Sequence, residues 1–180
     1  MKLNFMKTGG FFLTSMLLLA APAAHADFSA GLSTVRAPIT ANDPGTIGGT
    51  ADGWRAHVSY MFNRNFGIEG GLSKYGSPDD QSVPSNMHVD TEAYDIYAVA
   101  YYPMGNNDSG IYAKVGYVSM DTESEVNDTN ETHHQEDTLG LSFGGEYFFT
   151  ERVGLRAELE WFDSAISGEM KYSLGGVIRF

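Results

Sequence analysis

The segment that decides the fold is Trp54-Arg55-Ala56-His57-Val58-Ser59-Tyr60-Met61-Phe62, in which apolar and polar residues alternate. Its even-numbered positions carry only apolar or aromatic residues, whereas Arg55, His57 and Ser59 occupy odd-numbered ones. Successive side chains of a β-strand point to opposite faces. The period of two therefore predicts a strand that separates an apolar environment from a polar one.

The same alternation recurs along the chain and predicts eight strands. They are expected at 28–35, 54–62, 66–74, 94–102, 111–119, 138–149, 153–162 and 170–180. The segment 94–102 fits either phase, because Tyr94, Ile96 and Tyr97 suit both faces. Its inward and outward residues are therefore left open.

The connections between the predicted strands also alternate, in length. Residues 63–65, 103–110 and 150–152 form short connections, whereas 36–53, 75–93, 120–137 and 163–169 are mostly longer and more polar. Three short inner turns and four outer loops are what an antiparallel, up-and-down barrel needs when both of its termini lie in the periplasm. The pattern thus predicts an all-β, eight-stranded barrel, either transmembrane or of the soluble, exported lipocalin type.

Three features favour the transmembrane barrel. The polar face is rich in glycine, which suits the crowded lumen of eight strands but gains nothing on a water-exposed face. Its glycines are Gly67, Gly71, Gly116, Gly140, Gly144, Gly154 and Gly175.

Large aromatic residues stand at both ends of the apolar face, as in the two girdles of a membrane barrel. Those expected at the inner rim are Tyr60, Phe62, Phe66, Tyr102, Tyr147, Phe149 and Phe180, and those toward the outer rim are Trp54, Tyr117, Trp161 and Tyr172. The last predicted strand, which runs to Phe180, would close the sheet on the first and leave no edge.

The N-terminal segment predicts export. Lys2 and Lys7 precede an apolar run from Phe11 to Ala21, and Ala24-His25-Ala26 has the small-x-small pattern of a cleavage site. A transmembrane helix is the alternative, but that run is near half of the roughly 20 apolar residues that spanning requires. We therefore expect a cleaved signal peptide over 1–26 and a barrel over 27–180.

Composition limits the possible partners. The predicted signal holds two of the eleven basic residues and none of the 23 acidic ones, so 27–180 carries 9 minus 23, a formal charge of −14. Nucleic acid and bare anionic membrane surfaces are therefore disfavoured. The chain has no cysteine, which excludes disulfides and thiolate metal sites.

Four charged residues are expected at one level inside the barrel. Glu69, Lys114, Glu146 and Arg156 each lie three residues from the inner end of a predicted strand, on its polar face. Two acids and two bases at one height in a narrow lumen can pair, and an unpaired member would cost several kcal/mol. They form either a polar core or a gate whose pairs exchange to open a thin ion path.

Further charges balance on the predicted lumen face, so the excess negative charge falls in the loops. The further residues are Arg55, Asp95, Glu158, Glu160, Lys171 and Arg179. Together with the first four they make five acids and five bases on this face. Residues 121–137 alone hold seven acids and no base, which predicts a solvated, mobile outer loop. The alternative is binding of divalent cations that bridge to lipopolysaccharide, although no spaced calcium-loop pattern is present.

No catalytic, metal or cofactor site is expected. His57 points into the predicted lumen, as a hydrogen-bonded interior imidazole or, alternatively, a pH switch. His88, His133 and His134 are expected in loops, where adjacent His133 and His134 rarely aim at one zinc ion. An enzyme acting on lipid A would need a Ser/His/acid arrangement at the lipid edge, and no Gly-x-Ser-x-Gly elbow occurs.

Four segments resemble the small outer-membrane barrels similar to the transmembrane domain of outer membrane protein A. They are Asp95-Ile96-Tyr97, Ile111-Tyr112-Ala113-Lys114, Gly154-Leu155-Arg156-Ala157-Glu158-Leu159-Glu160-Trp161 and Ile178-Arg179-Phe180. The resemblance implies a location in the outer membrane, a lumen plugged by Glu/Lys and Glu/Arg pairs, and Phe180 as the signal read by the outer-membrane assembly machinery. Longer members add a periplasmic domain that holds peptidoglycan, and this chain is expected to consist of the barrel alone.

The sequence therefore predicts a monomeric outer-membrane barrel with a structural or surface-interaction role through acidic outer loops. Its expected partners are outer-membrane lipid and lipopolysaccharide. A narrow or gated ion channel is the alternative function, and a lipid A-modifying enzyme is a lesser one.

Overall fold

The computed structural model describes residues 27–41, 47–76, 87–105, 109–126, 130–162 and 170–180. For the strand ends 38–41, 47–49, 87–90, 122–126, 130–134, 136 and 162 it describes the backbone alone. The signal peptide predicted for 1–26 lies outside these residues and stays a prediction. The described part of the chain contains no helix long and apolar enough to cross a membrane.

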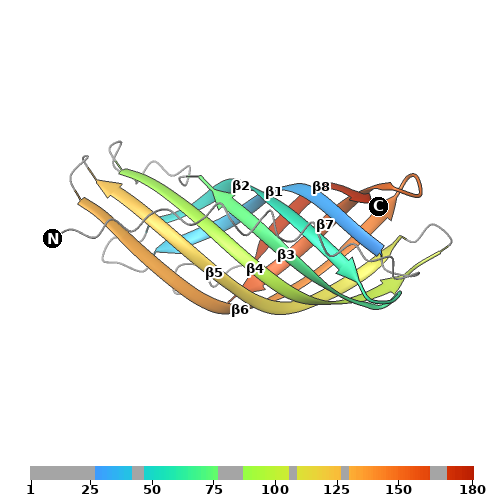
Figure 1. The fold of residues 1–180 in the computed structure, drawn as a ribbon. Coiled ribbons are helices and arrows are strands. Elements are labelled where there is room, and N and C mark those ends of the chain that lie inside the picture. Colours follow the sequence, from blue (N-terminus) through green and yellow to red (C-terminus); the bar gives the residue numbers. More distant parts are fainter. Residues whose placement is uncertain (1–26, 42–46, 77–86, 106–108, 127–129, 163–169) are drawn as a thin grey trace.

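Eight antiparallel strands form one closed, up-and-down barrel, which confirms the predicted fold class (Figure 1). The strands are β1 (Asp27–Ala41), β2 (Ile47–Met61), β3 (Phe66–Tyr75), β4 (Met87–Pro103), β5 (Gly110–Val126), β6 (Asn130–Phe148), β7 (Val153–Phe162) and β8 (Lys171–Arg179). The barrel closes where β1 pairs with β8, from Ser29 opposite Arg179 to Arg36 opposite Tyr172. Beyond this ladder, the Phe180 N–H donates to the Phe28 carbonyl at 2.9 Å.

The three predicted short connections lie together at the end of the barrel that holds the C-terminus. Side-chain oxygens form two of these turns. Asn63 Oδ1 accepts from the N–H groups of Asn65 and Phe66, each at 2.9 Å, and Thr150 Oγ1 accepts from that of Val153 at 2.9 Å. In the third, Gly105 has a φ of 80°, a left-handed conformation that glycine adopts without strain.

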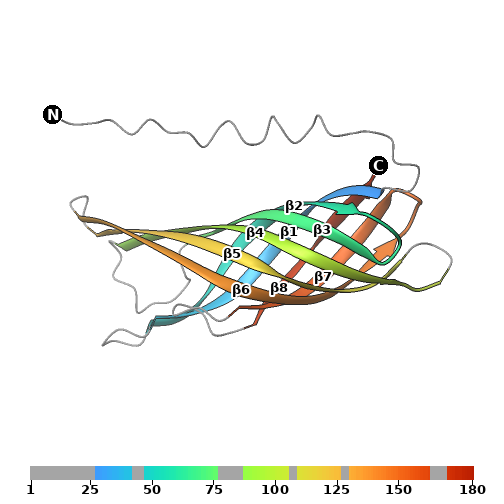
Figure 2. The same cartoon turned by 60° about the horizontal axis from the view of Figure 1, so that its bottom comes forward.

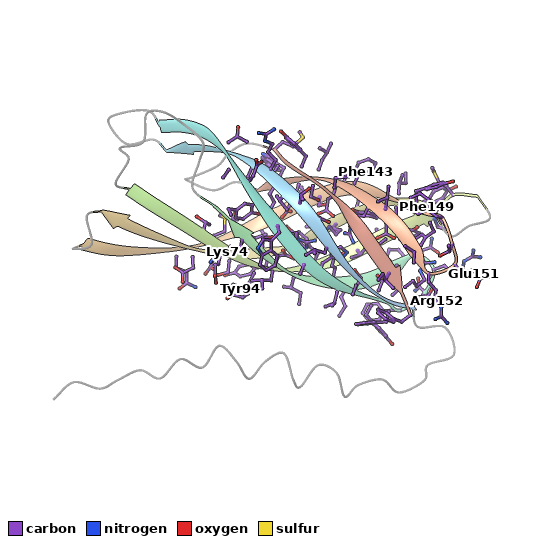
Figure 3. All side chains as sticks on the ribbon, turned by 90° about the horizontal axis from the view of Figure 1, so that it is seen from above. Lys74, Tyr94, Phe143, Phe149, Glu151 and Arg152 are labelled. Carbon is purple, nitrogen blue, oxygen red and sulfur yellow. The ribbon has the colours of Figure 1, made fainter. Side chains whose placement is uncertain are left out.

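The outer ends of five strands are longer than the alternation predicts. The prediction of a mobile loop over 120–137 is wrong, because most of this segment is strand. β5 continues to Val126, and β6 begins at Asn130, which is the register partner of Val126. His88, His133 and His134, expected in loops, likewise belong to β4 and β6. The outer ends of β1 and β2, and of β4 to β6, diverge as two separate extensions (Figures 2 and 3). Backbone pairing continues there although the sequence of these ends lacks the alternation of large apolar and polar residues that marks the membrane-spanning part.

The outside of the barrel is apolar. Its exposed side chains include Leu32, Val58, Ile96, Leu141 and Leu174, each at least 39% exposed. The aromatic residues predicted for the two girdles all face outward, and apart from the half-buried Tyr60 each is at least 41% exposed. Such a surface is expected against lipid, and a soluble barrel would leave it in water.

The structure also settles the phase of β4. Asp95, Tyr97 and Val99 point into the lumen, whereas Tyr94 and Ile96 point outward. Tyr97 lies flat against the wall, and its hydroxyl stands where a Cβ at Gly140 would be. The glycine therefore makes room for the ring.

Toward the outer end the lumen is apolar, which the sequence did not predict. A cluster of buried side chains fills it, each at most 6% exposed: Val35, Ala37, Ala51, Tyr75, Ala93, Tyr97, Val118 and Met120. Five of these eight residues lie in segments that were predicted as outer loops, 36–53, 75–93 and 120–137. They separate the polar lumen from the outer mouth.

A charge on the outer surface tests the lipid-facing assignment. Val58→Arg is expected to lower the free energy of unfolding by about 2–4 kcal/mol, because Val58 faces outward midway between the girdle residues Trp54 and Phe62. Denaturant titration of the refolded protein in lipid vesicles measures this. Gln135→Arg, at an exposed position on the outer extension of β6, is the matched control and should cost less than about 1 kcal/mol. Equal small losses for both variants would contradict a bilayer around Val58.

Two glycines of opposite orientation test the packing of the lumen. Gly140→Ala is expected to destabilise by about 1–3 kcal/mol, because the new methyl group displaces the Tyr97 ring. At Gly70, on the outside, the nearest atom to a new Cβ is 3.7 Å away, so Gly70→Ala should be neutral or slightly stabilising. The same titration compares them, and similar effects would refute the close approach of Tyr97.

Candidate functional site

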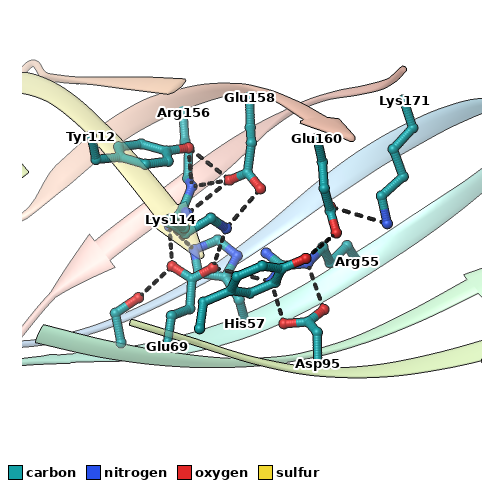
Figure 4. Close-up of polar contacts among 12 residues, drawn as sticks. Arg55, His57, Glu69, Asp95, Tyr112, Lys114, Arg156, Glu158, Glu160 and Lys171 are labelled. Carbon is teal, nitrogen blue, oxygen red and sulfur yellow. Dashed lines mark hydrogen bonds and ion pairs between the residues drawn. The ribbon is translucent and has the colours of Figure 1, made fainter. Parts of the chain in front are cut away.

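The candidate site is a belt of charged side chains across the middle of the lumen (Figure 4). Among the described residues, four acids and four bases there are at most 8% exposed: Arg55, Glu69, Asp95, Lys114, Arg156, Glu158, Glu160 and Lys171. Alternation along β2 to β5, β7 and β8 directs them inward. The equal numbers matter, because a buried charge without a partner costs several kcal/mol.

Glu69 of β3 is the hub of this belt. Its carboxylate lies 3.0 Å from Arg55 Nη2, 2.7 Å from Lys114 Nζ and 2.7 Å from Arg156 Nη1. The Ser59 hydroxyl donates a further hydrogen bond to it at 2.8 Å. Three strands besides β3 thus hold one carboxylate.

Arg156 of β7 is the corresponding cationic hub. Its Nη2 lies 2.8 Å from Glu158 Oε2, and its Nε donates to the Tyr112 hydroxyl at 2.7 Å. Nη1 also lies 2.9 Å from His57 Nε2, and because arginine can only donate, that imidazole nitrogen accepts. The guanidinium stacks 4.4 Å from the Tyr112 ring centroid, a cation–π contact that adds to the ion pairs.

A second, smaller group lies next to the apolar cluster. Lys171 of β8 contacts Glu160 at 3.0 Å and donates to the Tyr75 hydroxyl at 2.7 Å. Tyr97, from the opposite wall, donates to Glu160 at 2.5 Å. Tyr75 and Tyr97 therefore join the charged belt to the apolar cluster.

Of the four residues predicted at one level, the structure brings Glu69, Lys114 and Arg156 into direct contact. Glu146 stands at the margin, 3.4 Å from Arg156 Nη1. The further predicted residue Glu158 joins this group through Lys114 at 2.7 Å.

The remaining predicted lumen charges divide between the two groups. Arg55 holds Asp95 at 2.7 Å in the larger one, whereas Glu160 and Lys171 form the smaller one. Arg179 lies closer to the inner end, 4.1 Å from the Phe148 ring centroid. At the end of the chain, the Phe180 ring packs against Phe28 at a centroid distance of 5.7 Å, and its role as an assembly signal stays a prediction.

Sequence reasoning missed the buried tyrosines. Tyr75, Tyr97 and Tyr112 each bind a charged lumen residue through the hydroxyl group. Their spacing from charged residues could have identified two of them. Tyr112 is two residues from Lys114, and Tyr97 is two residues from Asp95, so each shares a strand face with a lumen charge. A tyrosine two residues from a charged residue on the same strand face is thus a signal for a member of the network.

The two ends of the lumen differ. A cavity of about 70 Å³ opens at the inner end, and its lining includes the charged residues Asp27, Glu69, Glu146, Arg156 and Arg179. Its deepest charged members, Glu69 and Arg156, belong to the belt. Beyond the belt stands the buried apolar cluster, which separates this cavity from the outer end of the described lumen.

The described residues hold no group of three or more His, Asp or Glu side chains placed to bind a metal ion. His57 is 3% exposed inside the barrel, and its contact with Arg156 occupies Nε2. Burial in the lumen keeps this imidazole away from the lipid-facing surface, where an enzyme acting on lipid A would need it.

Comparison with known proteins agrees with this architecture. The family model described as "Outer membrane protein beta-barrel domain" matches residues 11–174. None of the curated proteins matches the chain in sequence.

Several solved structures share the fold. Ail, the attachment invasion locus protein of Yersinia pestis, solved with the heparin analogue sucrose octasulfate, aligns over 87% of this chain and 99% of its own, with 14% identity and a TM-score of 0.64. Neisserial surface protein A aligns over 84% and 95%, with 13% identity and a TM-score of 0.64. OprG from Pseudomonas aeruginosa aligns over 87% and 96%, with 13% identity and a TM-score of 0.62. At such identities the likeness concerns the fold.

A double-mutant cycle tests the hub. Glu69→Gln and Lys114→Met should each destabilise by about 3–5 kcal/mol, because each leaves an opposite charge buried. Their coupling should reach roughly 0.5–3 kcal/mol. The control cycle pairs Glu69→Gln with Lys171→Met from the smaller group and should be additive within about 0.5 kcal/mol. Denaturant titration in lipid vesicles gives all four values, and additive losses for Glu69 with Lys114 would rule out the pair.

Proposed function

Because the chain belongs to the outer membrane protein β-barrel domain family and lies in the outer membrane, we propose that it is a closed barrel with a structural and surface-interaction role, neither an open pore nor an enzyme. The observation that carries this proposal is the filled lumen. Ion pairs of 2.7–3.0 Å cross it at mid-height, and an apolar cluster lies beyond them.

The size of the barrel supports a closed state. The interior of eight strands is just wide enough for side chains, and aqueous channels use about 16 strands or more. Moving Lys114 or Arg156 aside would separate charges that are buried on every side, at a cost of several kcal/mol. An ion entering from the inner cavity would still meet the apolar cluster around Val118 and Met120.

The surface available for interaction is the outer extension of β4 to β6, made of residues 87–93, 119–126 and 130–139. These residues include eight acids and no lysine or arginine. In the strand register, Glu92 stands opposite Asp121, Asp90 opposite Glu123, and Glu125 opposite Glu131. Like charges directly opposite each other destabilise a sheet. A positively charged partner would relieve this repulsion.

The sign of this charge argues against a polyanionic partner. Ail was solved with sucrose octasulfate, a polyanion, whereas the outer extension of this chain is acidic. We therefore place the partner among basic surfaces, or divalent cations that bridge to lipopolysaccharide.

Neutralising the acidic face tests this function. The variant Asp90→Asn, Glu123→Gln, Glu125→Gln and Glu131→Gln should bind polylysine at least about tenfold more weakly at low ionic strength, because binding between opposite charges depends there on Coulomb attraction. Immobilised, refolded protein in detergent gives the affinity, with and without calcium. Heat-modifiable mobility on gels should stay unchanged, since these positions lie outside the closed part of the barrel.

The control variant is Asp27→Asn with Glu151→Gln, two exposed acids at the inner end, which should keep the binding of the unmodified protein. Unchanged binding by the neutralised variant would reject the proposed surface. Frequent large conductance steps from the intact protein in planar bilayers would reject the closed barrel.

A further inference from the structure

Basic residues are rare on the outside of this barrel. Residues 27–180 contain nine lysines and arginines, all within the described part of the chain. Five belong to the lumen, and Arg64 and Arg152 lie in the inner turns. The two that remain, Arg36 and Lys74, both point outward near the outer ends of their strands.

Arg36 and Lys74 lie on the two strands that border β2, near its residue Trp54. Arg36 on β1 stands opposite Asp52 of β2, and Lys74 on β3 stands opposite Trp54, two residues further along β2. The two bases are thus separated by one strand and offset by two residues, which places their Cα atoms roughly 12 Å apart at the usual spacings. The long side chains of arginine and lysine can reach into the space above that strand.

These residues lie at the level of the outer girdle. Arg36 is the register partner of Tyr172 on β8, and Lys74 that of Trp54. Tryptophan and tyrosine mark the polar headgroup level of a bilayer. Figure 3 shows Lys74 and Tyr94 toward the end of the barrel opposite Glu151 and Arg152, which mark the inner turns.

The ion pairs that these bases form leave them available. Arg36 Nε lies 3.0 Å from Asp52 Oδ1, with side chains 51% and 64% exposed. Lys74 Nζ lies 3.4 Å from Glu92 Oε1, with side chains 42% and 46% exposed. Exposed pairs of this kind contribute about 0–1 kcal/mol. A ligand with greater negative charge can therefore compete for both bases.

We propose that Arg36, Trp54 and Lys74 form a binding site for a phosphate group of lipopolysaccharide in the outer leaflet. Phosphate is the anion at this depth, and guanidinium binds it through paired hydrogen bonds. Trp54, 41% exposed between the bases, packs against the apolar part of the same lipid. On β5 and β6 the corresponding outward positions hold Asp121 and Asp137 with no base, so this contact is confined to the β1–β3 side.

The test measures lipopolysaccharide bound by the mature protein in phospholipid nanodiscs, with EDTA present to remove bridging by divalent cations. The double variant Arg36→Gln/Lys74→Gln should bind about tenfold or more weakly, the scale of losing one charge-assisted hydrogen bond. Arg64→Gln/Arg152→Gln, at the inner turns, is the matched control and should bind as the unmodified protein does. Lipopolysaccharide stripped of phosphate should bind the unmodified protein as weakly as the double variant binds the intact lipid.

A second double variant should change lipopolysaccharide binding in the opposite direction. Misfolding would weaken binding and therefore cannot produce this result. Asp52→Asn/Glu92→Gln removes the competing carboxylates and should strengthen binding severalfold. Millimolar inorganic phosphate should not displace the lipid, which separates a lipid site from a site for free phosphate. Three results would overturn the proposal. The first is equal binding by the unmodified protein, Arg36→Gln/Lys74→Gln and Asp52→Asn/Glu92→Gln. The others are undiminished binding of the dephosphorylated lipid and displacement of the lipid by inorganic phosphate.

Discussion

Inside a bilayer the backbone finds no water, so every N–H and C=O group in a spanning segment must bond within the protein. The ladder between β1 and β8 meets this demand, because it removes the two edges that an open sheet of eight strands would expose. The terminal hydrogen bond from Phe180 to Phe28 extends the closure to the last residue of the chain. The rest of the structure depends on this closed ladder.

Closing only eight strands creates a narrow interior that must be filled. Four of its bases and four of its acids are almost fully buried, and the sharing of Glu69 among Arg55, Lys114 and Arg156 links β2, β3, β5 and β7. Tyrosine hydroxyl groups satisfy carboxylate oxygens that the bases do not reach, as at Glu160. A side chain that moved out of the belt would leave both a cavity and an unpaired buried charge. The lumen residues must therefore satisfy close packing and charge balance at the same time.

At the outer rim, the outward-facing charges are distributed unevenly around the barrel. The β1–β3 side carries Arg36 and Lys74 at the girdle, whereas β4 to β6 carry acids both there and beyond it. An outer leaflet of phosphorylated glycolipid presents anions and the divalent cations that bridge them. Among the described residues, the two outward-facing bases of the outer rim therefore lie on one side of the barrel only.

The sequence by itself determined the number of strands, the three inner turns and the charges that enter the lumen, because alternation between lipid and lumen is a local pattern that each strand shows alone. Only the tertiary structure decided that Lys114 meets Glu69 and Glu158 and not Glu146, since pairing across the lumen depends on the stagger of strands distant in sequence. It also decided the phase of Tyr97, whose ring fits either side until Gly140 makes room for it. The outer length of β5 and β6 was likewise hidden, because backbone hydrogen bonds extend a ladder beyond the bilayer, where the sequence no longer alternates between lipid-facing apolar residues and polar ones.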